Sequence, residues 1–174
     1  MIELIMACAP GVAPYTIQEI VRVESEGNPI TINVNKRKGV SFPHKKIEKK
    51  RDAIAVTLEA MRLGHSVDIG YMQLNSSNLE YLGYTVADAF QPCKNLAGGA
   101  KIFSEAYATC LKKGLPEQPA LLCALSIYNT GNSRDGFHNG YVQRYMDSKP
   151  RRPTINPYTA TTAVSFTKKE KHHE

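Results

Sequence analysis

The sequence has no hydrophobic run long enough to cross a membrane. Its longest mainly apolar run covers residues 119–128, whereas a membrane-spanning helix needs about 20 such residues. Residues 1–7 contain no Lys or Arg and include Glu3, which is not typical of a secretory signal. We therefore expect a protein that is not integral to a membrane. It is either cytosolic or a mature fragment whose leader has been removed.

Metal-binding motifs are also missing. The four cysteines form no C-x-x-C pair, and His44, His65 and His138 stand at no spacing typical of metal ligands. We therefore expect no zinc site, and no other metal or cofactor. The even number of cysteines is compatible with two disulfides or with four buried thiols.

Strand signals are few, and internal repeats are absent. A chain of 174 residues, 42% hydrophobic and 22% charged, has the composition of one ordinary globular domain. Helical hydrophobic spacing predicts a first helix opened by Pro14 and Thr16, with Thr16 and Glu19 as a T-x-x-E capping box, ending at Gly27. Further helices are expected over residues 52–63, 75–82, 85–90, 95–113, 117–128 and 137–146. Strands are expected only over 30–34 and 69–74.

The expected architecture is one mainly α domain with a minimal β element, over residues 8–148. Residues 149–174 are rich in Pro, Thr and Lys without periodicity, which predicts a basic, flexible C-terminal tail.

The positive charge is concentrated in two segments. The net charge is +6, but residues 36–51 hold eight Lys or Arg residues against one Glu, and the C-terminal tail is also basic. Such segments attract polyanions, or are simply solvated surface. No aromatic residues alternate with the basic ones, so nucleic acid is not an expected partner.

One acidic residue occupies an apolar position. Glu24 continues the helical stripe formed by Ile17, Ile20 and Val21. Burial, the negative end of the helix dipole and nearby Glu26 should all raise the pKa of its carboxyl group. A carboxyl that stays protonated near neutral pH is what a general acid requires. The alternative is a structural role, in an ion pair with an Arg or as a cap on a neighbouring helix.

Three short motifs, the first of which begins at Glu24, resemble those of a known family. They are E-S-E-G-N-P at 24–29, G-Y-M-Q-L-N at 70–75 and Y-N-T-G at 128–131. In this order they resemble the signature motifs of lytic transglycosylases with a goose-lysozyme-like fold, over residues 8–146. The resemblance implies a mainly α (α+β lysozyme-like) fold with a sugar-binding cleft.

Further segments narrow the resemblance. C-A-P at 8–10, Q-P-C-K-N-L at 91–96 and G-Y-V at 140–142 resemble the specialised transglycosylases of type IV secretion systems. The resemblance implies a periplasmic enzyme that opens peptidoglycan locally, with other secretion subunits as candidate partners.

An oxidising periplasm favours disulfides between the four cysteines. A helix over 95–113 holds Cys93 and Cys110 about 25 Å apart, so they cannot pair. Two pairings stay open: Cys8–Cys93 with Cys110–Cys123, which we prefer, and Cys8–Cys110 with Cys93–Cys123.

The resemblance also implies roles for individual residues. Glu24 protonates the glycosidic oxygen and then, as a carboxylate, removes the proton of the muramyl C6 hydroxyl, which closes an anhydro ring. Tyr128 donates a hydrogen bond to Glu24, and Asn129 shapes that turn. Gln73 and Asn129 are alternatively ordinary turn residues. The implied substrate-binding residues are Ser25, Gly70, Tyr71, Met72, Gln73, Tyr128 and Asn129.

Two points stay open within the resemblance. D-I-G-Y-M-Q-L-N at 68–75 is also similar to the catalytic-aspartate strand of hen-type lysozymes. Asp68 is therefore either a second catalytic carboxylate of a muramidase hydrolase or a structural hydrogen-bond acceptor. The substrate-contacting Ser that many members carry between the first two motifs has no assigned counterpart, and Ser41 and Ser66 are candidates. A non-catalytic glycan-binding assembly factor is a further alternative.

Overall fold

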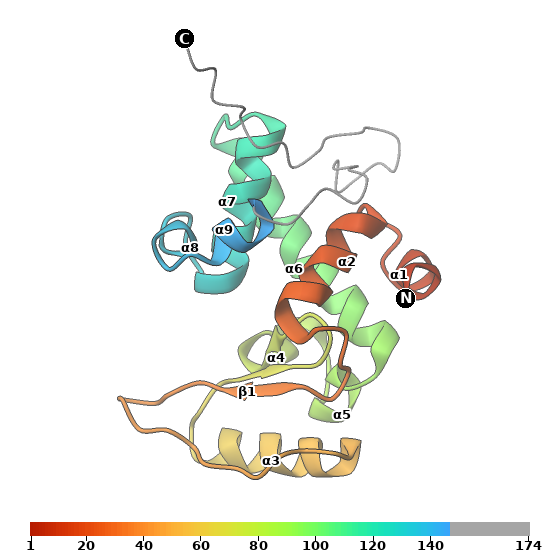
Figure 1. The fold of residues 1–174 in the computed structure, drawn as a ribbon, viewed down its shortest axis with the longest axis vertical. Coiled ribbons are helices and arrows are strands. Elements are labelled where there is room, and N and C mark those ends of the chain that lie inside the picture. The colour runs from red at the N-terminus through yellow and green to blue at the C-terminus, as the bar shows by residue number, and fades with distance from the viewer. Residues whose placement is uncertain (147–174) are drawn as a thin grey trace. The chain divides into compact units, whose positions relative to one another are not determined.

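The structure is a computed structural model that describes residues 1–146, so the expected tail over 149–174 lies outside the described residues. Helices dominate it, and a small antiparallel sheet is its β element, as expected (Figure 1). The first elements in chain order are α1 (Ile2–Cys8), α2 (Pro14–Ser25), β1 (Ile32–Val34), α3 (Lys50–Arg62), β2 (Val67–Ile69) and β3 (Leu74–Asn75). The remaining elements are η1 (Ser76–Asn78), α4 (Leu79–Leu82), α5 (Val86–Ala89), α6 (Pro92–Lys112), α7 (Glu117–Thr130), α8 (Asp135–His138) and α9 (Tyr141–Met146).

Two compact units are distinguished along the chain. Among the described residues, the first contains Met1–Ala9 and Ile20–Gly99, and the second contains Pro10–Glu19 and residues 100–146. Helices α2 and α6 each contribute residues to both units.

The first unit is built on the three-stranded sheet. The strand order is β1–β2–β3, all antiparallel, and Ile32 is paired with Ile69, which is paired in turn with Leu74. Ile69 and Leu74 alternate with polar neighbours and are fully buried, which is typical of a sheet with one covered face. Helix α3 contacts β1 and β2 (Figure 1). The sheet therefore fixes both ends of residues 70–73, the loop that joins β2 to β3.

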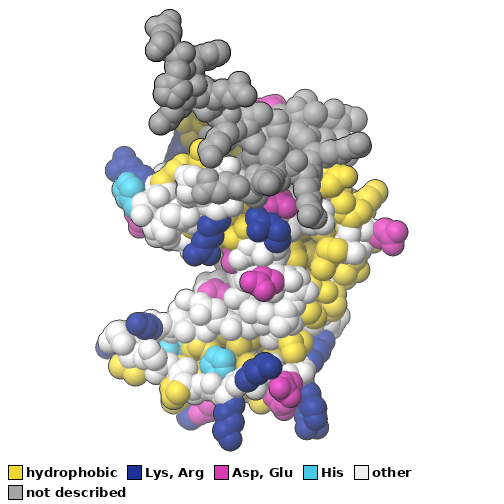
Figure 2. Space-filling model, in the orientation of Figure 1, with side chains coloured by type: hydrophobic (Ala, Val, Ile, Leu, Met, Phe, Trp, Pro, Cys, Tyr) yellow, Lys and Arg dark blue, Asp and Glu magenta, His cyan; other side chains and the backbone are white. Residues whose placement is uncertain are grey.

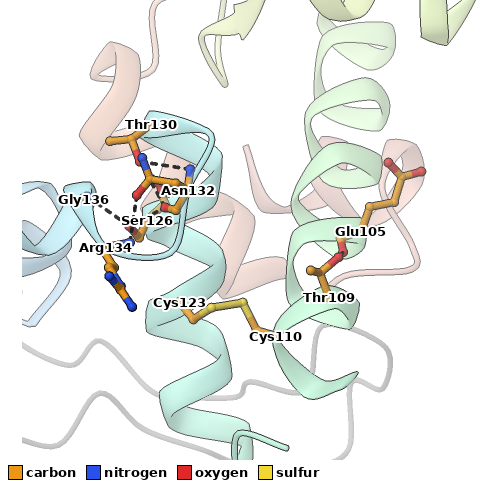
Figure 3. Close-up of a disulfide and its surroundings, with 9 residues drawn as sticks. All are labelled: Glu105, Thr109, Cys110, Cys123, Ser126, Thr130, Asn132, Arg134 and Gly136. Carbon is orange, nitrogen blue, oxygen red and sulfur yellow. Dashed lines mark hydrogen bonds between the residues drawn. A yellow bond between two sulfur atoms is a disulfide. The ribbon is translucent and has the colours of Figure 1, made fainter. Parts of the chain in front are cut away.

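The second unit is centred on α7, where a helix was expected over 117–128, and this helix is apolar on nearly all sides. It contacts α8 and α9, and the Cys110–Cys123 disulfide joins it to α6 (Figure 3). Gly136 of α8 approaches α7 so closely that a Cβ there would lie 2.6 Å from the Cα of Ser126. The Ser126 hydroxyl accepts the N–H of Gly136 and donates to the carbonyl of Asn132 (Figure 3). These contacts fix the chain that follows α7.

The other disulfide, Cys8–Cys93, lies in the first unit. The two bonds follow the pairing preferred from the sequence, and none of residues 1–146 is a free cysteine.

Several sequence predictions need correction. The first helix does start at Pro14, but Thr16 lies inside it and does not cap it, and its buried hydroxyl has no hydrogen-bond partner among the described residues. Helix α1 had not been predicted. The single helix expected over 137–146 is two helices, because Gly140 takes a positive φ of 78° and Asn139 caps the N–H of Tyr141. The strand expected over 69–74 is a hairpin.

Within residues 1–146, no helix is both long enough and apolar enough to cross a membrane. The same part of the chain contains no group of three or more His, Cys, Asp or Glu side chains placed to hold a metal ion.

Candidate active site

Glu24 and Ser25 form the C-terminal end of α2. The preceding stripe of Ile17, Ile20 and Val21 is almost completely buried, Glu24 is half-buried, and Ser25 is 6% exposed. The helix ends because Glu26 adopts a positive φ of 53°, a left-handed conformation in which a helix cannot continue. The sequence pattern therefore places Glu24 on the buried side of its helix, at the last turn.

The Ser25 side chain connects this helix end to the second motif. Its hydroxyl lies 3.1 Å from the carbonyl oxygen of Val21, one turn earlier, and 2.8 Å from the carbonyl oxygen of Tyr71. Because the hydroxyl has one proton, the two carbonyls share it. The longer connection fixes the residue next to Glu24 against residues 70–73.

Residues 70–73 form a tight loop with two unusual backbone conformations. Gly70 has φ of 71° and Gln73 has φ of 46°. The first suits glycine, whereas the second is uncommon for a residue with a side chain and costs about 1 kcal/mol or more. The Gly70 N–H donates to the Thr31 carbonyl at 2.8 Å, and the Gln73 N–H donates to the Gly70 carbonyl at 3.2 Å. The strained conformation is therefore held by hydrogen bonds on both sides.

The side chain of Gln73 is oriented by the same carbonyls. Its amide nitrogen donates to the carbonyl oxygens of Thr31, at 3.2 Å, and Gly70, at 3.0 Å. Both N–H groups are thereby used within the protein. The group that Gln73 can offer to a ligand is its carbonyl oxygen Oε1, which accepts hydrogen bonds.

Asn95 holds this loop through hydrogen bonds to its backbone and to the end of β2, and no role had been predicted for it. It is 1% exposed on α6, and its side chain makes three buried hydrogen bonds. Oδ1 accepts the N–H of Met72 at 2.9 Å, while Nδ2 donates to the carbonyls of Ile69 and Ala89, each at 2.8 Å. The sequence signal that could have indicated this role is a polar residue among the buried positions of α6, within the motif Q-P-C-K-N-L.

Met72 points from the loop into a space that only glycine leaves open. Its side chain is fully buried, and a Cβ at Gly99 of α6 would lie 2.6 Å from its Sδ. Such a contact is well inside van der Waals distance, so residue 99 has to lack a side chain. Asn95 and Gly99, one helical turn apart, thus position the backbone and the side chain of Met72.

Asp68 holds the three strands together. Its Oδ2 accepts from the amide nitrogens of Asn33, at 3.2 Å, and Asn35, at 3.0 Å, and its Oδ1 accepts from that of Asn75 at 2.6 Å. Asn33, Asp68 and Asn75 lie on β1, β2 and β3 respectively. The Asp68 carboxylate therefore has a structural function in the sheet.

The corner between α5 and α6 supports Asn95. Thr85 and Asp88 form the capping box of α5, which lies within the helix expected over 85–90. Asp88 also accepts a 2.6 Å hydrogen bond from Lys94, the residue before Asn95. The bond from Lys94, followed by those from the Thr85 backbone and hydroxyl, lowers the pKa of Asp88 to about 2 from an ordinary 3.8.

Tyr128 and Asn129 belong to the second unit, at the end of α7. The Tyr128 ring meets the buried Phe103 ring edge-on, with centroids 6.0 Å apart. The Asn129 side chain is exposed and accepts a 3.0 Å hydrogen bond from the amide of Asn139, which the sequence analysis had not singled out. The hydrogen bond expected from Tyr128 to Glu24 stays a prediction.

The two serine candidates lie elsewhere in the first unit. Ser66 accepts a 3.2 Å hydrogen bond from the Asn35 amide, and Ser41 is exposed in the segment before α3. Neither gains a role in substrate contact from these positions.

Comparisons with known proteins agree with the family that these motifs resemble. Residues 3–150 match the family described as transglycosylase SLT domain. This covers most of the chain, and the chain belongs to that family.

Two relatives with the name virB1 are similar to this chain. The chain is 39% identical over 152 residues to the type IV secretion system protein virB1 of Brucella abortus, covering 83% of this chain and 62% of that protein. It is 37% identical over 137 residues to protein virB1 of Agrobacterium fabrum, covering 79% of this chain and 54% of that protein. The chain thus spans little more than half the length of these relatives. No solved structure matches it.

Proposed function

We propose that this chain is a peptidoglycan lytic transglycosylase that cleaves the β-1,4 bond between N-acetylmuramic acid and N-acetylglucosamine and leaves 1,6-anhydro-muramyl ends. Membership in the transglycosylase family supports the reaction class. The observation that carries the proposal for this chain is the hydrogen bond from Ser25 to the Tyr71 carbonyl. It joins the residue after Glu24 to the loop whose motif implies sugar binding.

Glu24 carries both proton transfers. As an acid it gives its proton to the bridging oxygen, so the bond from that oxygen to C1 of the muramyl sugar breaks. As a carboxylate it then takes the proton of the C6 hydroxyl, whose oxygen bonds to C1. The glutamate ends as it began, and no water is consumed. Burial beside Ile20 and Val21 and a position at the helix C-terminus support the acid role, and a raised pKa stays a prediction.

The loop 70–73 supplies polar groups to the sugar in this proposal. The Gln73 Oε1 accepts an N–H or O–H from the substrate, since the Gln73 amide nitrogen is already bonded to Thr31 and Gly70. A loop fixed by Asn95, Met72 and the sheet has little freedom to lose on binding, which favours a defined sugar position.

A hydrolytic muramidase using Asp68 is the alternative with a different product. The three amide hydrogen bonds to Asp68 support a structural role for this carboxylate and hence the transglycosylase route. A non-catalytic glycan-binding factor would retain binding without cleavage.

The setting is proposed from the relatives. Two of them bear the name virB1, one of these with the words type IV secretion system. We infer that this chain opens the cell wall for such a system, in contact with its other subunits. The two disulfides support an oxidising compartment, which in this setting is the periplasm.

Mass spectrometry of peptidoglycan digests tests the proposal. The wild type should release anhydro-muropeptides, Glu24→Gln should lose nearly all activity, and Asp68→Asn should have an intermediate effect. Glu80→Gln is the matched control, because Glu80 is an exposed carboxylate of the same unit, on α4. Products with reducing ends would identify a hydrolase, and full activity of Glu24→Gln would refute the assignment of the acid.

A further inference from the structure

A strongly cationic segment runs from just after β1 into the first turn of α3, in the first unit. We call residues 36–51 the basic loop. It carries eight Lys or Arg residues against Glu48, and all eight basic side chains are exposed. Figure 2 shows Lys and Arg side chains along the lower edge of the view, where Figure 1 places α3 and the loop before it.

Most of this charge is not neutralised by the protein. Lys46 is 3.7 Å from Glu48, and Arg51 is 3.3 Å from Asp52. Within residues 1–146, the structure records no ion pair for five further lysines of the loop: Lys36, Lys38, Lys45, Lys49 and Lys50. A concentration of like charge in one segment attracts anions and is unfavourable without them.

The loop is nevertheless anchored, unlike a merely solvated charge run. Arg37 donates a 2.7 Å hydrogen bond to the Leu63 carbonyl at the end of α3, where a cation also complements the helix dipole. Gly64 makes room for this contact, since a Cβ there would lie 2.7 Å from the guanidinium carbon of Arg37. Phe42 meets the His65 ring edge-on, with centroids 5.7 Å apart. Arg37 and Phe42 thus attach the basic loop to the end of α3 and to His65.

The anchored loop continues directly from the candidate active site. The Thr31 carbonyl accepts hydrogen bonds from the Gly70 N–H and from the Gln73 side chain. Strand β1 leads from Thr31 to Lys36, a distance of at most about 17 Å at the usual strand rise. The lysines therefore begin within that distance of the loop assigned to sugar binding, in the same unit.

We propose that the basic loop binds the carboxylates of the stem peptides that peptidoglycan strands carry, which holds the strand beside residues 70–73. This inference rests on the proposed function. Lysine ammonium groups suit carboxylates whose positions vary from one repeat to the next, because they act as point charges without strict geometry. Nucleic acid fits less well, since base stacking needs exposed aromatic rings and the only Phe of the loop packs on His65.

Co-sedimentation with insoluble peptidoglycan tests this surface, with Glu24→Gln as the background so that the strands stay intact. The test variant is Lys45→Glu/Lys46→Glu. The matched control is Lys112→Glu/Lys113→Glu, an exposed lysine pair of the second unit. We expect the test variant to bind about tenfold more weakly at low ionic strength, with the difference shrinking as salt screens the charges. The neutral Lys45→Gln/Lys46→Gln variant should fall between it and the background.

A second substrate identifies the ligand. On glycan strands stripped of stem peptides by an amidase, with the lactyl carboxylates that this hydrolysis frees then converted to neutral amides, the test variant and the control should bind equally. Equal binding of the test variant and the control to intact peptidoglycan would overturn the proposal. It would also be overturned if the test variant bound stripped strands as much more weakly than the control as it binds intact peptidoglycan. If the test variant binds DNA more weakly than the control but binds peptidoglycan equally well, the proposal is overturned in favour of nucleic acid as the ligand. The assay measures no cleavage, so absence of anhydro products would refute the proposed reaction and leave this result standing.

Discussion

The hydroxyl of Ser25 donates to the carbonyl oxygen of Tyr71 at 2.8 Å, across 46 positions of sequence. This is a direct link between the helix that carries Glu24 and the loop that carries Gln73. The orientation of the helix end and the shape of the loop therefore depend on each other.

Replacing Ser25 by Ala should loosen this connection. We expect the free energy of unfolding to fall by about 1 kcal/mol, because the Tyr71 carbonyl loses a part-buried partner. Peptidoglycan cleavage should fall by more than the loss of folded protein explains. Ser77→Ala is the control, since that exposed hydroxyl bonds only to nearby Asn75. Equal activity of the two variants would contradict the link.

Asn95 should be the most sensitive polar position of the first unit. Asn95→Leu leaves the Met72 N–H and the carbonyls of Ile69 and Ala89 without partners, and we expect a loss of about 3 kcal/mol or more in urea unfolding. Asn95→Asp keeps an acceptor for Met72 but places negative charge against two carbonyls. Its deficit should shrink as the pH falls from about 7 to about 4, because the protonated acid can donate again. A pH-independent deficit would argue against this geometry.

Asp88 should make stability depend on pH in a narrow acidic range. Its pKa is about 2 in the folded protein and near 3.8 without its partners. Above 3.8 the group is ionised in both states and its stabilisation is complete. Below that value the unfolded chain takes up a proton first, so the stabilisation declines and is lost as the pH falls through 2. The difference in melting temperature between wild type and Asp88→Asn should follow this course. Asp135→Asn, on the second unit, is the comparison.

The two disulfides should contribute unequally. Loop entropy predicts about 4.5 kcal/mol for Cys8–Cys93, which joins residues 85 positions apart, and about 3 kcal/mol for Cys110–Cys123, 13 positions apart. Replacing the first pair by serines should therefore lower the melting temperature more. It should also lower activity more, because Cys93 lies two residues before Asn95. A larger effect from the second pair would show that local packing, not loop length, decides.

Local features of the sequence predicted local features of the structure. The helices α5, expected over 85–90, and α7, expected over 117–128, and the end of α2 before Gly27 all follow from residues within a few positions of one another. The Thr16 box failed because Pro14 begins the helix two residues earlier, so Thr16 is already in its first turn.

Contacts between distant segments could not be predicted in this way. Asn95 has an ordinary place on a helix, and only the folded chain brings the carbonyl of Ile69 to it. The asparagines around Asp68 come from β1, from the residue that follows it and from β3, and no spacing rule connects these segments with Asp68. The break at Asn139 and Gly140 depends on a single left-handed residue inside a pattern that otherwise reads as one helix.

The left-handed backbone of Gln73 has a practical implication for protein engineering. An automated search for thermostabilising substitutions would choose glycine at this position, because it removes the steric penalty at once. The resulting variant would lose the side-chain amide that we propose contacts the sugar, so any gain in thermal stability would come with weaker recognition of the polymer. Screening by melting point alone would rank such a variant first.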